Sequence, residues 1–155
     1  MSYEIRTRRL DPQPVLSIRG PVDPDGIEEA VGEFLGEVWK KLEADGREPA
    51  GPPFTRYHQI GESELVLEAG FPVSEEAAGE GRIESGELPG GEAISTDHIG
   101  PYEELPAAGE ALEAWARERG RSAAGPRWEV YWTDPGEVED PEQWRTEVFM
   151  PLQPR

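Results

Sequence analysis

Apolar residues recur at three- and four-residue intervals in two parts of the chain, which predicts two amphipathic helices. The first stripe consists of Ile27, Val31, Phe34, Leu35, Val38 and Leu42. The second consists of Leu105, Ala108, Leu112, Trp115 and Ala116. Gly46 and Gly120 follow these stripes, at the position where a helix end favours a left-handed residue. Each stripe is therefore expected to pack against a hydrophobic core.

Segments rich in β-branched and aromatic residues flank both helices and predict strands. One precedes the first helix at residues 15–18. A hairpin follows each helix, with strands at residues 54–60, 63–70, 127–133 and 144–151. The first hairpin turns at Gly61-Glu62 and the second through residues 134–141. The pattern predicts an α+β fold in which an antiparallel sheet is covered on one face by two helices.

The chain also repeats itself, which indicates a duplicated unit. Residues 45–57 align with residues 119–131, and residues 67–73 align with residues 146–152. We predict two strand-helix-strand-strand halves, residues 3–73 and 81–152, each with a short opening strand. They are expected to be related by a pseudo-twofold axis within a single domain spanning residues 1–155, with residues 74–81 as a linker.

Charge excludes several classes of partner. The chain has 33 acidic and 15 basic residues and a net charge of −18, which argues against direct binding of nucleic acid or an anionic membrane surface. No apolar run is long enough to span a bilayer, and the N-terminus lacks the pattern of a secretory signal. We therefore expect a cytoplasmic protein.

The sequence offers no pattern typical of a metal or cofactor site. Cysteine is absent, and His58 and His98 lie on different segments. Because no nucleotide-binding motif occurs either, neither a metal site nor a cofactor is expected.

Side-chain alternation sorts each hairpin into two faces. The face expected to pack beneath the helices carries Trp128, Val130, Trp132, Thr146, Val148 and Met150. The opposite face is expected to carry Glu129, Tyr131, Glu147 and Phe149 in the second half, and Tyr57 and Glu68 in the first. This face is either ordinary exposed sheet or the wall of a cleft between the halves. A cleft of aromatic rings and carboxylates selects planar or amphipathic cations.

Several ordered segments resemble the GyrI-like family, also called the AraC-type or bacterial transcription-activator effector-binding domain. They are residues 98–105 (HIGPYEEL), Trp115, residues 125–131 (GPRWEVY), Asp134-Pro135 and residues 144–151 (WRTEVFMP). The resemblance covers nearly the whole chain and implies a duplicated fold with a central ligand cleft. It also implies binding of cationic or amphipathic drugs or toxins, for sensing or sequestration. The family's acidic contacts then fall on Glu147 and Glu129, and its aromatic walls on Tyr102, Tyr131 and Phe149.

Two other functions stay open within the same resemblance. Some family members hydrolyse reactive cyclopropanoid toxins, so Glu147 is a candidate general acid or base, with Tyr131 or Tyr102 orienting a water molecule. Others resemble gyrase inhibitors, which makes a protein-interaction module the second alternative. Because the first predicted strand begins near Tyr3, we expect no helix-turn-helix, and a sensing role requires a separate protein partner.

Overall fold

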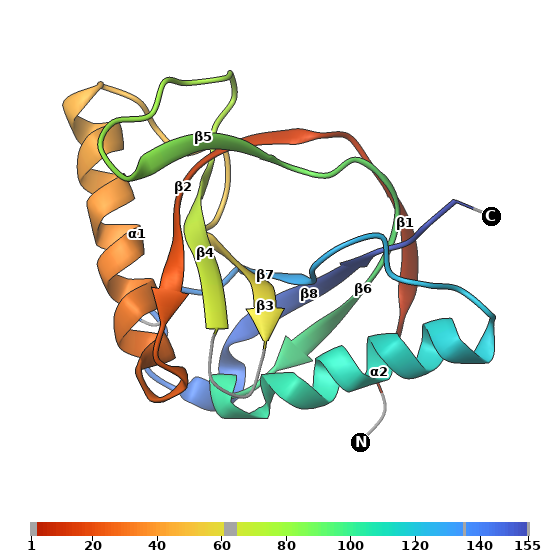
Figure 1. The fold of residues 1–155 in the computed structure, drawn as a ribbon. Coiled ribbons are helices and arrows are strands. Elements are labelled where there is room, and N and C mark those ends of the chain that lie inside the picture. The colour runs from red at the N-terminus through yellow and green to blue at the C-terminus, as the bar shows by residue number, and fades with distance from the viewer. Residues whose placement is uncertain (1–2, 61–64, 135, 155) are drawn as a thin grey trace. The chain divides into compact units, whose positions relative to one another are not determined.

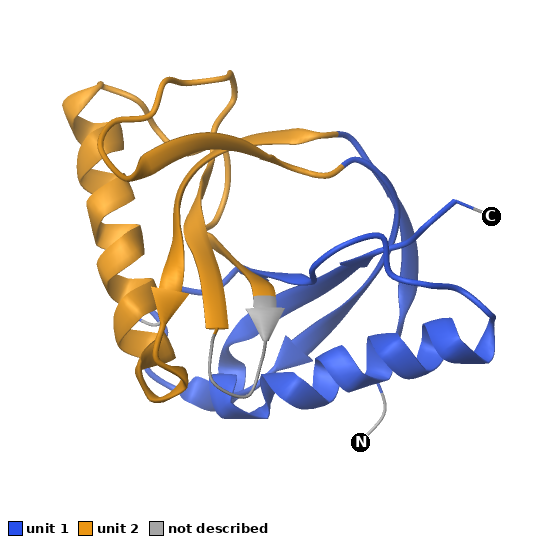
Figure 2. Cartoon of the chain, viewed as in Figure 1, with its two compact units in different colours: residues 1–11, 90–155 blue, residues 12–89 orange. Residues whose placement is uncertain are grey.

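The computed structural model describes residues 3–60, 65–134 and 136–154 (Figure 1). The chain forms two compact units, which Figure 2 distinguishes by colour. Unit 1 comprises residues 1–11 and 90–155, and unit 2 comprises residues 12–89. Each unit consists of antiparallel strands and one long helix, so the α+β class predicted from the sequence is confirmed. The predicted turn at Gly61-Glu62 lies outside the described residues.

The sheet of unit 1 has the strand order β1-β6-β8-β7. Its strands are β1 (Arg6–Leu10), β6 (Gly91–Ile99), β8 (Arg145–Pro151) and β7 (Trp128–Tyr131). Helix α2 (Leu105–Glu118) packs against β6 and β8, and 3-10 turns precede α2 (η2, Tyr102–Glu104) and β8 (η3, Pro141–Gln143). The core beneath α2 contains Val148 and Met150, as predicted, together with Leu105, Ala108, Leu112 and Ala116 of the helix.

The sheet of unit 2 has the strand order β3-β4-β2-β5. Its strands are β3 (Phe54–Ile60), β4 (Leu65–Pro72), β2 (Gln13–Val22) and β5 (Ile83–Leu88). Helix α1 (Ile27–Ala44), preceded by the 3-10 turn η1 (Pro24–Gly26), packs on β4 and β2. The predicted stripe supplies the buried Phe34, Val38 and Leu42. Both predicted helix ends are confirmed, because Gly46 and Gly120 adopt φ values of 67° and 64°.

The opening strand of each half pairs with the strands of the other half. Strand β1 opens the predicted first half but lies beside β6 in unit 1, whereas β5 opens the predicted second half but lies beside β2 in unit 2. Residues 74–81 also belong to unit 2, and Ala77 within them is buried in its core. Pairing with β6 therefore brings the charged side chains of β1 close to β8, near the C-terminal end of the chain.

Gly70 marks a close approach between two strands of unit 2. It lies on β4 opposite Ser17 of β2. A Cβ atom at Gly70 would lie 2.0 Å from the carbonyl oxygen of Leu16 and 2.7 Å from the Cα of Ser17. The equivalent position of unit 1 holds Phe149, which lies opposite Ser95. Only a residue without a side chain fits between β4 and β2 at this point.

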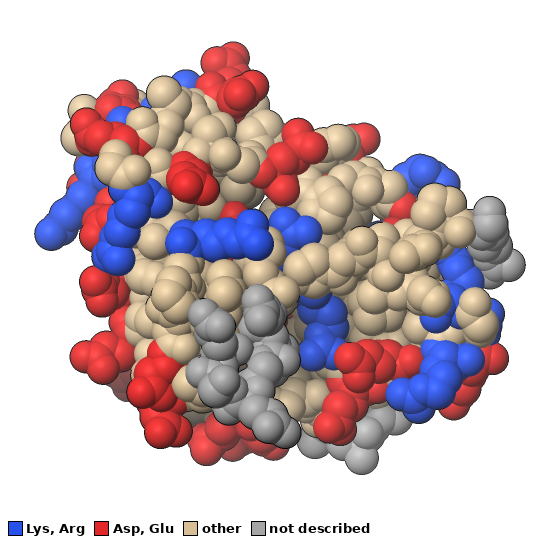
Figure 3. All heavy atoms as spheres, in the orientation of Figure 1, with Lys and Arg blue, Asp and Glu red and all other residues tan. Residues whose placement is uncertain are grey.

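Acidic side chains are spread over the face drawn in Figure 3 rather than gathered in one place. In the face drawn in Figure 3, Asp and Glu occur at many separate positions and Lys and Arg lie among them. Ion pairs such as Arg82 with Glu33 and Glu37 connect several of them. Among the described residues only Glu68, Glu129 and Glu147 are buried acidic side chains, so most of the 33 carboxylates lie at or near the surface.

Candidate functional site

Glu147 is the most deeply buried acidic side chain in unit 1. It lies in the middle of β8 and is only 2% exposed. Its Oε2 atom accepts hydrogen bonds from Arg6 (2.9 Å), Arg8 (2.8 Å) and the Ser95 hydroxyl (2.8 Å). Its Oε1 atom accepts one from the indole N–H of Trp132 at 3.1 Å. Because guanidinium and indole nitrogens only donate, these contacts fit an ionised carboxylate.

A second acidic group extends this ion-pair network on the same sheet face. Asp97 of β6 lies opposite Glu147 in register and accepts two hydrogen bonds from Arg6. Arg145 of β8 also pairs with Asp97, at 3.3 Å. Burial raises the pKa of Asp97, but the hydrogen bonds and charges of Arg6 and Arg145 outweigh burial and lower the pKa. The hydrogen bond to Asp97 is also the main cause that raises the pKa of Arg6. Arginines therefore compensate both carboxylates of this face.

Aromatic rings lie on the same face of the sheet as the Glu147 carboxylate. Trp128 of β7 stacks on Phe149 of β8, with ring centroids 5.2 Å apart and an interplanar angle of 8°. The guanidinium of Arg8 lies over the Phe149 ring, 5.5 Å from its centroid. Trp132 is 47% exposed, and the guanidinium of Arg145 lies over its ring, 5.2 Å from the centroid. Arg8 thus combines a carboxylate contact with a cation–π contact.

The face prediction for the strand at residues 127–133 is wrong. Trp128 lies opposite Phe149, and Val130 lies opposite Glu147. Directly paired residues of antiparallel strands have their side chains on the same face. Trp128, Val130 and Trp132 therefore share the face of Glu147 instead of packing beneath α2.

Glu129 and Tyr131 accordingly lie on the helix side of the sheet, away from Glu147. The Tyr131 hydroxyl donates to Glu129 at 2.9 Å. The Tyr131 ring packs against Tyr102 of η2, with centroids 5.5 Å apart, and Tyr102 contacts Trp144 at 4.8 Å. Of the predicted site residues in this unit, the structure therefore brings Glu147 together with Phe149, and Glu129 with Tyr131 and Tyr102, as two separate groups.

Unit 2 holds the counterpart of the Glu147 arrangement. Glu68 of β4 is 8% exposed. It accepts a hydrogen bond from the Ser17 hydroxyl at 2.6 Å, and His58 Nε2 lies 2.6 Å from its other oxygen. Tyr57 was expected on the same face, but it lies opposite Leu67 and packs against the core beneath α1. The predicted pairing of Tyr57 with Glu68 on one face is therefore wrong.

The sequence reasoning missed the donors that hold Glu147. Arg6 and Arg8 alternate along β1, which places both side chains on one face of that strand. Ser95 lies opposite Phe149 of β8 as Ser17 lies opposite Gly70 of β4, so the two serines have equivalent places in their sheets. The Arg-x-Arg spacing was a visible signal, but the register of the serines and the pairing of β1 with β6 were not.

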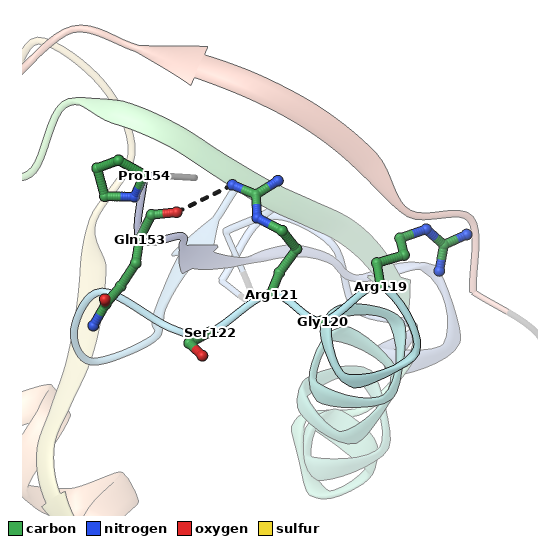
Figure 4. A pocket seen from close by; sticks show the side chains of 6 residues that line it. All are labelled: Arg119, Gly120, Arg121, Ser122, Gln153 and Pro154. Carbon is green, nitrogen blue, oxygen red and sulfur yellow. Dashed lines mark hydrogen bonds between the residues drawn. The ribbon is translucent and has the colours of Figure 1, made fainter.

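A recess in unit 1 is separate from these groups. It has a volume of about 310 Å³ and is lined by Arg119, Gly120, Arg121, Ser122, Gln153 and Pro154 (Figure 4). Arg121 extends toward the C-terminal segment and donates to the Gln153 carbonyl at 3.1 Å (Figure 4). None of the predicted site residues lines this recess.

Residues 3–60, 65–134 and 136–154 contain no cluster of three or more His, Asp and Glu side chains suited to holding a metal ion. His58 belongs to unit 2 and His98 to unit 1. Within the same described residues, neither long helix has the apolar length needed to cross a bilayer.

The chain belongs to the GyrI-like family of small-molecule binding domains. The family model matches residues 3–153, which is nearly the whole sequence. The chain is thus a GyrI-like small molecule binding domain, and the resemblance seen in the sequence is confirmed. A comparison with curated proteins finds no match.

Solved structures share this fold. The C-terminal domain of EcmrR has a TM-score of 0.82 and 23% sequence identity, with all of both chains covered. EcmrR in a complex with DNA gives a TM-score of 0.86 and 21% identity over 99% of this chain, which spans only 58% of the EcmrR chain. SAV2435 bound to tetraphenylphosphonium gives 0.66 and 12% identity, covering 99% of this chain and 94% of that one. A hydrolase from Listeria innocua gives 0.65 and 16%, covering 97% and 92%.

Proposed function

We propose that unit 1 binds an amphipathic aromatic cation on the face that carries Glu147, for sensing or sequestering a drug or toxin. The observation that carries this proposal is the position of Arg8. Its guanidinium pairs with Glu147 at 2.8 Å and lies over the Phe149 ring at 5.5 Å. A cation attached to an aromatic group makes the same two contacts, so Arg8 occupies the place of such a ligand.

Exchange of Arg8 for a ligand is favoured by its location. Arg6 and Arg8 lie on the outer strand β1 of the unit 1 sheet, and their side chains are 39% and 40% exposed. They can therefore regain water when displaced, whereas Glu147 at 2% exposure needs a counter-ion. The ligand's charge replaces that counter-ion, and its rings extend the Trp128–Phe149 stack. The tetraphenylphosphonium complex of SAV2435 supports the same ligand class.

Tetraphenylphosphonium is expected to bind this protein and to quench its tryptophan fluorescence. Glu147→Gln should weaken binding at least tenfold, because the counter-ion is lost. Arg8→Gln should strengthen binding several-fold, because the internal competitor is removed. A fluorescence titration, repeated by calorimetry, measures both changes.

Matched variants control for unspecific effects of charge. Arg9→Gln removes the same charge from an exposed position on the opposite face of β1, and Glu110→Gln removes a carboxylate exposed on α2. Both should leave the affinity within twofold. Unchanged binding by Glu147→Gln, or weaker binding by Arg8→Gln, contradicts the proposal, since the latter means that the arginines themselves contact the ligand.

Hydrolysis of an electrophilic cyclopropane toxin stays the alternative prediction. It assigns acid–base chemistry to Glu147, with Tyr131 or Tyr102 orienting water. Glu129, rather than Glu147, accepts the Tyr131 hydroxyl hydrogen bond in this structure. Catalytic consumption of such a compound that Glu147→Gln abolishes would support the alternative. The protein-interaction alternative instead predicts salt-sensitive capture of a large partner.

A further inference from the structure

The two units contain the same Ser–Glu pair at equivalent positions of the repeat. In unit 1, Ser95 on β6 donates to Glu147 Oε2 on β8 at 2.8 Å. In unit 2, Ser17 on β2 donates to Glu68 Oε2 on β4 at 2.6 Å. Both glutamates are buried on the side of their sheet that is turned away from the helix core. A second buried carboxylate of the same design is therefore present in unit 2.

The two carboxylates differ in how far their hydrogen-bonding capacity is used. An ionised carboxylate has about four lone-pair sites. Glu147 accepts from four donors, two of which are guanidinium groups. Among the described residues, Glu68 hydrogen-bonds only with Ser17 and His58. Glu68 therefore retains acceptor capacity that Glu147 does not.

The neighbouring outer strand explains this difference. In unit 1, Arg6 of β1 lies opposite Ser95 and reaches Glu147. In unit 2, Glu84 of β5 lies opposite Ser17 and offers a carboxylate in place of an arginine. The exchange of outer strands therefore places Arg6 and Arg8 beside Glu147, whereas the outer strand β5 has no arginine to offer Glu68.

Gly86 lies beside the Glu68 carboxylate. This residue is exposed on β5. A Cβ atom there would lie 3.9 Å from Glu68 Oε2 and 3.6 Å from Val15 Cγ2, both ordinary van der Waals distances. A side chain at this position would fit without a clash and would cover the carboxylate oxygen. With glycine, no side chain at this position covers that oxygen.

The charges that face Glu68 set the kind of group that it accepts. Arg19 and Arg56 lie opposite Glu68 on its two neighbouring strands, and Glu84 shares the face. Burial lowers the pKa of Arg56 more than the charge of Glu68 raises it. The acidic and basic groups of this face balance, so net charge alone does not attract a cation. Selection of a ligand then depends on hydrogen-bond direction, because Glu68 is a buried carboxylate with unused acceptor sites.

We propose that unit 2 carries a second binding position, centred on Glu68 and reached past Gly86, for a cation that donates N–H hydrogen bonds. An amidinium or primary ammonium group on a small aromatic body fits this chemistry, because it fills the open acceptor sites. Tetraphenylphosphonium has no N–H and does not. The position consists of unit 2 residues, whereas Glu147 belongs to unit 1, and the two proposals are tested with different probes.

Benzamidinium is the probe, with neutral benzamide as its analogue. We expect benzamidinium to shift backbone amide signals of β4 and β5 in an NMR titration, with benzamide binding at least tenfold more weakly. Glu68→Gln should weaken benzamidinium at least tenfold. Gly86→Val should do the same without changing any charge, because its side chain covers Glu68 Oε2. Circular dichroism confirms that both variants stay folded.

Two control variants separate this position from other effects. Glu87→Gln changes an exposed carboxylate on the opposite face of β5 and should leave the affinity within twofold. Glu147→Gln should also leave benzamidinium binding unchanged. Absence of benzamidinium binding, equal binding of benzamide, or a loss caused by Glu147→Gln but not by Glu68→Gln overturns the inference. Failure of tetraphenylphosphonium to bind, with Glu68-dependent benzamidinium binding retained, overturns the Glu147 proposal alone.

Discussion

Gly70→Ala is expected to destabilise the protein by about 3 kcal/mol or more, at the upper end of the cost of overpacking a core. The added methyl carbon would lie 2.0 Å from the Leu16 carbonyl oxygen, so the backbone of β2 or β4 has to move. Both strands are central in the unit 2 sheet, where β2 pairs on both sides. Urea denaturation followed by circular dichroism measures the loss directly.

Gly36→Ala is the matched control for this prediction. Gly36 lies within α1, and a Cβ atom there meets nothing within 4 Å. Because alanine is the better helix former, this variant should be stabilised by about 0.5–1 kcal/mol. A stable, fully folded Gly70→Ala protein would show that β2 and β4 can separate without cost, and would contradict the close approach described above.

Glu147→Gln is expected to lower the free energy of unfolding by about 2–4 kcal/mol, because breaking a buried ion pair leaves its partners uncompensated. Glutamine keeps the size of the side chain, but its amide group cannot neutralise Arg6 and Arg8. Arg8→Gln alone should cost less, about 1 kcal/mol, since Arg8 is already partly hydrated.

A double-mutant cycle isolates the pair. If Glu147 and Arg8 interact as described, the double variant should be more stable than the sum of the single losses predicts, with a coupling of about 1–2 kcal/mol. The pair Glu147 and Arg9 should give no coupling, because Arg9 lies on the other face of β1. Additive losses for Glu147 and Arg8 would contradict the ion pair.

Local periodicity was sufficient to predict the helices and most of the strands. Stripes at three- and four-residue spacing placed α1 and α2, and the glycine ends were located because each helix needs a left-handed residue there. These features depend on residues close together in the sequence. The family segments likewise lie within short runs, so the family was recognisable before the structure.

The faces of the short strands were not predictable in the same way. Trp128 and Glu129 are adjacent on β7, and both are buried. When both faces of a strand are covered, burial of an aromatic residue no longer shows which face meets the helix. The same ambiguity placed Tyr57 on the wrong side of β3. Only the register with the neighbouring strand decides the question.

The arginine contacts of Glu147 escaped prediction for a different reason. They join residues 139 and 141 positions apart, on two strands that do not pair with each other directly. Nothing near Glu147 in the sequence signals them. Glu147 therefore already has internal partners, and under the proposed function a ligand has to compete with them.

The exchange of outer strands also determines the order in which the two units can fold during translation. Unit 2 is continuous, residues 12–89, so all of its strands have been made before residues 90–155 are translated. Unit 1 contains segments from both ends of the chain. Arg6 and Arg8 of β1 cannot pair with Glu147 until β8, the last strand, has emerged from the ribosome. Since domains generally fold as they are completed, the Glu147 face is the last part of the molecule to assemble. A nascent chain stalled before Arg145 thus contains all of unit 2 but lacks the ion pairs that Glu147 makes with Arg6 and Arg8.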